Sequence, residues 1–235
     1  MTEPCKTRFI VLCLFLLTAV SALAQRGTFG VQAGETSDKF GTLPYSNAGL
    51  LGLDGDYALV QGNRKTQSPD IVIGGELRFP TSTSAHAEEL AAYGGLMFHF
   101  GDHFSAGFHA QIRKFLMPTT PLPNQTFNRY NMLVLESPAV LEYRFGPENH
   151  AFIQGQIQPE FTPRYSAPKS GTPFPHPTLD HAYTIRGTLG YDFSKYYLKA
   201  TYETRYFKFI PGTANPAFLA NWRTNAVTAG FGLVF

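Results

Sequence analysis

The sequence predicts an all-β chain, an antiparallel up-and-down transmembrane β-barrel, with ten strands favoured and eight as the alternative. Three observations predict it: an export signal at the N-terminus, long strands with one apolar and one polar face, and an alternation of short and long connections. No apolar stretch after Val20 is long enough for a spanning helix. A chain of this kind that enters a membrane has to cross it with strands.

The N-terminus has the layout of a cleaved secretory signal peptide over 1–24. Basic residues precede an apolar run over 9–20, and Ala22 and Ala24 are the small residues of a cleavage site. At about 1.5 Å per residue the run spans about 18 Å, too short for a hydrocarbon core of about 30 Å. We therefore expect cleavage after Ala24 and a mature barrel domain over 25–235.

Charge and cysteine content exclude several classes of protein. Both cysteines, Cys5 and Cys13, lie in the signal, so the mature chain has no disulfide and no cysteine metal site. Of 19 basic and 17 acidic residues, Lys6, Arg8 and Glu3 leave with the signal, so 17 basic and 16 acidic remain. This near balance indicates no nucleic-acid partner. We expect no cofactor and no bound metal.

Apolar and polar residues alternate along most of the mature chain. In the segment 70–79, Ile71, Ile73 and Leu77 share one face, while Glu76 and Arg78 share the other. Alternation of this kind indicates a strand with one apolar side. Strands of about 10 to 14 residues are long enough for a tilted strand to cross a bilayer. The expected strands are 27–34, 51–60, 70–79, 91–100, 104–115, 131–145, 150–161, 181–193, 196–209 and 223–235.

Connection lengths alternate as well, which is typical of transmembrane barrels with short turns on one side and long loops on the other. Tight turns are expected at 101–103, 146–149 and 194–195. The long loops are rich in proline and are expected at 80–90, 116–130, 162–180 and 210–222. The segment 25–69 either supplies the first two strands or, in an eight-stranded barrel, forms a periplasmic tail or plug.

The chain ends on "VTAGFGLVF", with Phe231, Leu233 and Phe235 on the apolar face of the last expected strand. This resembles the C-terminal signature of bacterial outer-membrane β-barrels, in which a terminal aromatic is read by the assembly machinery. The resemblance implies a place in the bacterial outer membrane and contact with its lipid and lipopolysaccharide. It also implies recognition by the barrel assembly machinery, and we expect a monomer.

The polar faces of the expected strands carry nearly equal numbers of acidic and basic side chains. A barrel of eight or ten strands has room for little more than its own side chains, and an unpaired buried charge is costly. We therefore expect a closed, salt-bridged interior, with a narrow polar pore as the alternative. The expected lumen charge network is Glu76, Arg78, Arg113, Glu142, Arg144, Glu160, Arg186, Asp192, Lys199, Glu203 and Arg205.

Two polar groupings are similar to catalytic motifs of outer-membrane enzymes. His103 and Ser105 form His-x-Ser, as in lipid A deacylases, but His103 lies in an expected turn. Asp54 and Asp56, together with 180–181, are similar to the residues of rim-sited proteases, and all four are expected near the extracellular rim. Asp180 and His181 are adjacent in the chain and therefore point to opposite faces of a strand, so we expect no catalytic site.

These observations favour a structural or surface-interaction barrel whose long Pro-rich extracellular loops make the contacts. A narrow pore for small solutes is the alternative function, and a surface hydrolase is the third, disfavoured one. The two inward-facing histidines, His99 and His109, are expected to act as hydrogen-bonding groups of the lumen.

Overall fold

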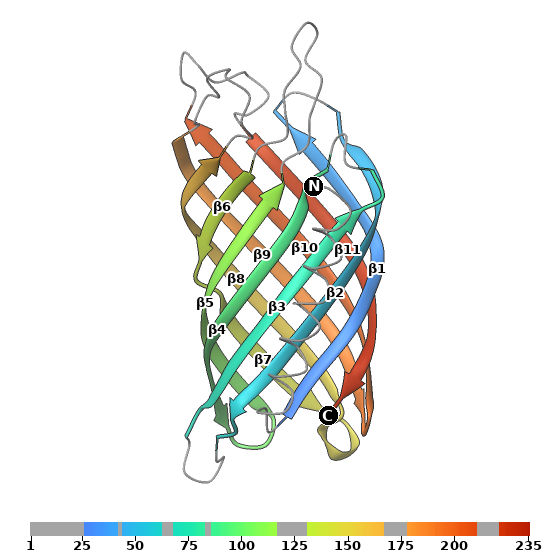
Figure 1. Cartoon of the computed structure of the whole chain (residues 1–235). Coiled ribbons are helices and arrows are strands. Elements are labelled where there is room, and N and C mark those ends of the chain that lie inside the picture. Colours follow the sequence, from blue (N-terminus) through green and yellow to red (C-terminus); the bar gives the residue numbers. More distant parts are fainter. Residues whose placement is uncertain are drawn as a thin grey trace, which may run out of the picture.

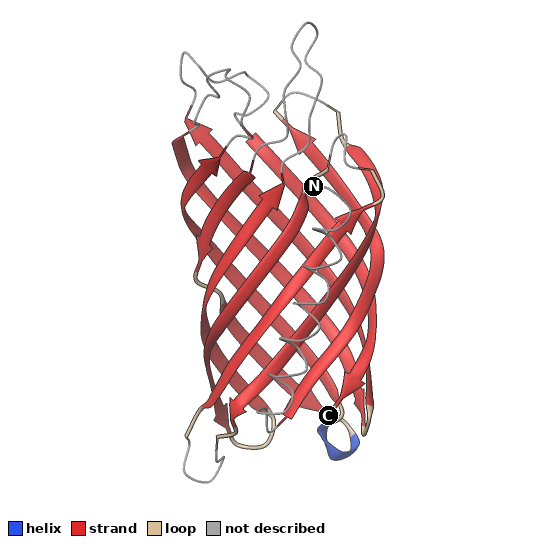
Figure 2. Ribbon diagram, viewed as in Figure 1, coloured by secondary structure: helices blue, strands red, loops and turns tan. Residues whose placement is uncertain are grey.

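The computed structural model describes residues 26–41, 44–62, 68–82, 86–116, 131–166, 178–210 and 221–235, with the side chains of 162–166 left aside. Over these ranges the chain forms one closed antiparallel barrel of tilted strands, taller than it is wide (Figures 1 and 2). The expected signal peptide and most of the long Pro-rich loops lie outside the described residues. Among the described residues, no helix is long and apolar enough to cross a bilayer.

The strands are longer than the sequence predicts, and most of the extra length is added at one end. Their bounds are β1 (Arg26–Phe40), β2 (Ser46–Val60), β3 (Asp70–Pro80), β4 (Glu88–Phe100), β5 (Phe104–Leu116), β6 (Asn131–Glu136), β7 (Ala139–Phe145), β8 (Ala151–Ser166), β9 (Thr178–Phe193), β10 (Tyr196–Ile210) and β11 (Asn221–Val234). A single short 3₁₀ turn, η1 (Pro147–Asn149), joins β7 to β8 among these residues.

The barrel has ten strands, because β6 and β7 are two segments of one strand: both pair with β5 on one side and β8 on the other. Each strand pairs with its neighbour in sequence, and β11 pairs with β1 to close the circle. Residues 26–60 therefore supply the first two strands and no plug. At the seam, Gly27 and Phe235 exchange two backbone hydrogen bonds of 2.7 and 3.0 Å.

The two ends of the barrel differ in their connections. At the turn end lie the short connections 101–103, 146–150 and 194–195, together with Phe235; at the loop end, β1, β5, β8 and β10 finish (Figure 1). The outer face is apolar over most of its height, as the alternation predicts. Outward charges such as Glu35, Lys39 and Lys114 stand on the parts of the strands nearer the loop end.

The break between β6 and β7 is caused by Ser137 and Pro138, since proline has no N–H to give to the ladder. The pairing with β8 keeps one register on both sides of the break. Pro159 lies opposite, inside β8, where its carbonyl accepts from the N–H of Ser137 at 3.2 Å. Pro138 therefore lies at the end of a strand segment, whereas Pro159 sits within β8 opposite the interruption.

Deleting Phe235 should lower the yield of folded barrel severalfold, because the deletion removes both backbone hydrogen bonds to Gly27 and the terminal outward aromatic. The yield is measured by the heat-sensitive mobility shift of folded barrels on a gel. Phe193→Ala, which removes another exposed aromatic at the turn end, is the matched control and should fold normally. Equal yields for the two variants would contradict a special role for the terminal residue.

Ile185→Arg should destabilise the barrel by about 2–4 kcal/mol, because the side chain points outward midway along β9, where lipid contact is expected. Phe193→Arg, on the same face of the same strand at the turn end, should cost only about 0–1 kcal/mol. Unfolding by urea in lipid vesicles measures both. Equal costs would mean that the apolar band does not lie where the strand pattern places it.

Candidate functional site: the lumen

The lumen between the two ends of the barrel has three levels, two filled by side chains and one hollow. Nearest the loop end is a set of buried apolar side chains, here called the aromatic cluster: Phe40, Ala87, Phe115, Met132, Val134, Ala182, Phe207, Phe209 and Trp222. Below it lies the arginine–glutamate network, formed by Glu76, Arg78, Glu89, Arg113, Glu136, Arg186, Glu203 and Arg205. Nearest the turn end is a cavity.

Ring stacking holds the aromatic cluster together. The Trp222 indole stacks on Phe207 with centroids 5.0 Å apart and on Phe40 at 5.6 Å, and Phe115 meets it edge-on at 5.0 Å. Phe115 and Phe207 have no exposed surface, and Trp222 keeps 1%. The sequence prediction missed this layer because it assigned apolar side chains to the lipid face. Phe207 lies on the same face of its strand as Glu203, so the alternation of the strand already indicated that Phe207 points inward.

A buried aspartate ties the aromatic cluster to the strand ends around it. Asp38 accepts hydrogen bonds from the Trp222 indole N–H at 3.1 Å and from the Thr224 hydroxyl, which fastens β1 to β11 across the seam. Its second oxygen lies 2.6 Å from Nδ1 of His86, and Nε2 of that ring lies 3.2 Å from the Ser46 hydroxyl. Asp38 and His86 are both buried, so the contact between them holds His86, which precedes β4, against the lumen.

Glu203 is the centre of the arginine–glutamate network. Its two oxygens accept from Arg78 at 2.8 and 3.1 Å, from Nε of Arg186 at 2.8 Å and from Arg205 at 2.8 Å. The carboxylate is 1% exposed, so the three guanidiniums take the place of water around it. Such charge-assisted, multidentate contacts are the arrangement that makes a buried carboxylate tolerable.

A second centre forms around Arg113. Its guanidinium lies 3.0 Å from Glu136 and 2.7 Å from Glu89, and Glu89 also accepts from Arg205 at 2.8 Å. The sequence prediction left out Glu89 and Glu136. Glu89 fell in the expected loop 80–90, whereas β4 begins at Glu88, and Glu136 shares its inward parity with Met132 and Val134 directly before the proline break.

All eleven charged residues expected in the lumen point inward, and each makes an ion pair, although not in one network. Toward the turn end, Arg144 pairs with Glu142 and with Asp192, each at 2.7 Å, and Lys199 pairs with Asp54. Glu160 lies beside the Arg205 guanidinium at 3.8 Å and accepts from the Thr184 hydroxyl at 2.6 Å. The expected assembly residues Phe231, Leu233 and Phe235 stand exposed on the outer face.

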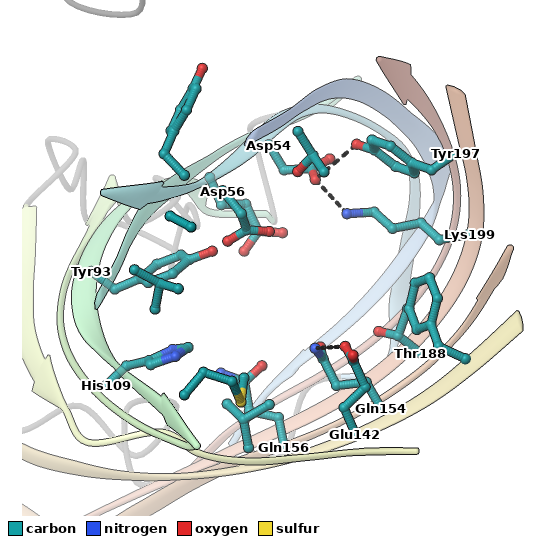
Figure 3. A pocket seen from close by; sticks show the side chains of 18 of the residues that line it. Asp54, Asp56, Tyr93, His109, Glu142, Gln154, Gln156, Thr188, Tyr197 and Lys199 are labelled. Atoms are coloured by element: carbon teal, nitrogen blue, oxygen red, sulfur yellow. Dashed lines mark hydrogen bonds and ion pairs between the residues drawn. The ribbon is translucent and has the colours of Figure 1, made fainter. Parts of the chain in front are cut away.

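The cavity has a volume of about 280 Å³ and lies in the half of the lumen next to the turn end. Asp54 and Asp56 of β2 stand on one wall, next to Tyr93, while Gln154 and Thr188 stand on the opposite wall (Figure 3). The walls are mostly polar, and the arginine–glutamate network bounds the cavity toward the loop end through Glu76 and Arg186.

Neither of the two groupings that are similar to catalytic motifs assembles in the structure. His103 lies in the turn and its Nδ1 contacts the Arg144 carbonyl at 3.1 Å, away from Ser105. The Ser105 hydroxyl instead lies 2.8 Å from Nδ1 of His99, whose Nε2 lies 2.9 Å from Asp70. This places Ser, His and Asp in a chain of hydrogen bonds. Ser105 is buried and is not among the residues that line the cavity.

The residues of the protease-like grouping lie in different parts of the barrel. Asp54 and Asp56 lie toward the turn end, and the prediction that placed them at the extracellular rim was wrong because β2 begins at Ser46 and not at 51, so both aspartates lie past its midpoint. Asp180 and His181 stand at the loop end, where Asp180 pairs with Lys208 at 2.9 Å. The described ranges contain no group of three or more His, Cys, Asp or Glu side chains suited to hold a metal.

A closed ten-strand barrel with an apolar outer face and a charged interior defines a β-barrel of the outer-membrane type. Neisserial surface protein A has a similar chain course, at 10% identity over 88% of this chain and 96% of that one, with a TM-score of 0.42. An outer membrane channel from Pseudomonas putida F1 is similar at 10% identity over 89% and 95%, with a TM-score of 0.46. The attachment invasion locus protein Ail of Yersinia pestis is similar at 8% identity over 89% and 98%, with a TM-score of 0.30.

No protein-family model and no curated protein matches the sequence. Similarity at the level of the three structures concerns the barrel architecture and assigns no activity.

Glu203→Gln should destabilise the barrel by about 3–5 kcal/mol, since it leaves three buried guanidiniums short of a counter-charge. The midpoint of urea unfolding in vesicles measures the loss. Glu148→Gln is the control: its side chain is 84% exposed and pairs only with His150, so it should change stability by less than about 1 kcal/mol. A Glu203→Gln barrel as stable as the control would mean that the network adds nothing to folding.

Proposed function

We propose that the protein is a sealed barrel of the bacterial outer membrane that acts through its extracellular surface and carries no solute across. The observation that supports this proposal is the burial of the lumen at mid-height and above. Arg78, Arg205 and Glu203 are at most 2% exposed, and Phe115 and Phe207 are fully buried. These side chains come from different walls of the barrel and meet in its centre, so they leave no room for a water column.

Location and partners belong to the same proposal. The expected signal peptide would export the chain, and the outward Phe231, Leu233 and Phe235 would present the C-terminal strand to the assembly machinery. The apolar outer face would contact lipid, and the charged strand ends at the loop end would lie at the level of lipopolysaccharide. The proposal assigns the contacts to the expected long Pro-rich loops, 80–90, 116–130, 162–180 and 210–222. The protein acts as a monomer without a catalytic step.

A narrow pore is the second candidate, and the cavity is the observation that favours it. About 280 Å³ of the lumen is already open on the turn-end side. A pore would therefore need only the network and the aromatic cluster to part. Against it stands the number of contacts that would break, because Glu203 alone holds three guanidiniums.

Single-channel recording of the refolded protein in a planar bilayer separates the two candidates. The sealed barrel should give no conductance steps at any applied voltage, after a gel mobility shift has shown that the protein is folded. A general porin recorded in the same bilayer is the positive control. Steady steps that scale with salt concentration would contradict the sealed barrel and support the pore.

A further inference from the structure

We propose that the turn-end cavity is a binding site for a small organic cation of the amine class, which enters from the turn end. This goes beyond the sealed barrel, which needs no ligand. Asp56 carries the proposal. Its side chain points into the lumen and is exposed there, and it has no ion pair or hydrogen bond among the described residues. Every basic residue that lines the cavity is already paired with another acid.

Asp54 adds a second acceptor beside Asp56. One of its oxygens accepts from the Tyr197 hydroxyl at 3.2 Å and from Lys199. The other oxygen, Oδ1, is buried and has no hydrogen-bond partner among the described residues, and Asp54 as a whole is only 9% exposed. A buried carboxylate oxygen without a donor is costly, so a ligand N–H that reaches it would be strongly favoured.

Tyr93 and His109 supply an aromatic surface next to these carboxylates. Their rings stack with centroids 5.1 Å apart and planes 8° apart. The Tyr93 ring lies directly over Gly74, where a Cβ atom would come within 2.4 Å of its hydroxyl end, and Gly74 is the ladder partner of Asp56. The ring therefore lies beside the free carboxylate (Figure 3). An ammonium group between them gains both a counter-charge and a cation–π contact.

The charge of the cavity selects the sign of the ligand. Its lining holds six acidic side chains (Asp54, Asp56, Asp70, Glu76, Glu142 and Asp192) and four basic ones (Arg26, Arg144, Arg186 and Lys199). The opposite wall carries the neutral side chains of Gln154, Gln156, Thr188 and Thr201, and Glu142 lies beside Gln154, whose amide donates to it at 3.3 Å (Figure 3). An anion would meet the free carboxylate of Asp56, whereas an amine with a second polar end would use both walls.

The route of entry follows from exposure. Water reaches Asp56 inside the barrel, while Arg78, Glu203 and Arg205 at mid-height are at most 2% exposed. The cavity therefore opens toward the turn end and is closed toward the loop end. Its volume of about 280 Å³ is at the small end of ligand pockets. This size suits a diamine such as putrescine.

Putrescine binding to the folded barrel in detergent, measured by titration calorimetry at constant ionic strength, tests the proposal. The wild type should bind putrescine, and Asp56→Asn should bind at least tenfold more weakly because it removes the unpaired charge at nearly constant shape. Glu35→Gln removes one acid from the outer face and is the matched control, which should bind as the wild type does. Gly74→Ala, which displaces the Tyr93 ring, should also weaken binding.

The neutral isostere 1,4-butanediol should not bind, because it lacks the charge that Asp56 selects. Equal binding of the diol, equal binding by Asp56→Asn, or no putrescine binding by a wild type that shows the folded mobility shift would each overturn the proposal. The result does not depend on whether the barrel conducts, so failure of the cation site and failure of the sealed-barrel function are observed separately.

Discussion

The pairing of β11 with β1 is the contact on which the rest of the barrel depends. In lipid no water satisfies a free N–H or C=O, so an open sheet edge is excluded and the ladder has to return to its first strand. Closing a ring of ten strands fixes a narrow interior. Inward side chains from opposite walls then have to share that space, and arginines such as Arg78 meet carboxylates such as Glu203 at its centre.

The two upper layers of the lumen support one another. The guanidinium of Arg205 lies 4.8 Å from the centroid of the Phe115 ring, and that of Arg113 lies 6.0 Å from it, so the charged layer meets the aromatic layer through cation–π contacts. Buried ion pairs add little net stability by comparison with apolar packing, but each partner is costly to leave alone. The network therefore fixes which side chains meet more than it adds to stability.

Strand parity is what the sequence makes predictable. With a period of two, the faces of β3, β9, β10 and β11 follow from their alternation alone, and so does the inward direction of Glu203 and Arg205. Strand number was predictable through the alternation of 51–60. The lengths of the strands at the loop end were not predictable, because Glu88 and Glu89 have the character of loop residues and only their pairing with β5 shows that they belong to β4.

The candidate site was less predictable than the fold. Arg78 and Glu203 are 125 residues apart and lie on strands that are not neighbours, so no ladder register relates them. The same holds for Lys199 and Asp54 across the cavity wall. The aromatic cluster could have been predicted from apolar residues at inward-facing strand positions, such as Phe207. A barrel interior accepts apolar side chains wherever water is excluded.

Trp222 is the only tryptophan of the chain, and it stands on β11 at the seam, stacked between Phe40 and Phe207. Phe40 belongs to β1 and Phe207 to β10, so the indole leaves water only when the two ends of the chain have come together. Its fluorescence emission therefore reports the pairing of β11 with β1, separately from the formation of the hairpins between consecutive strands.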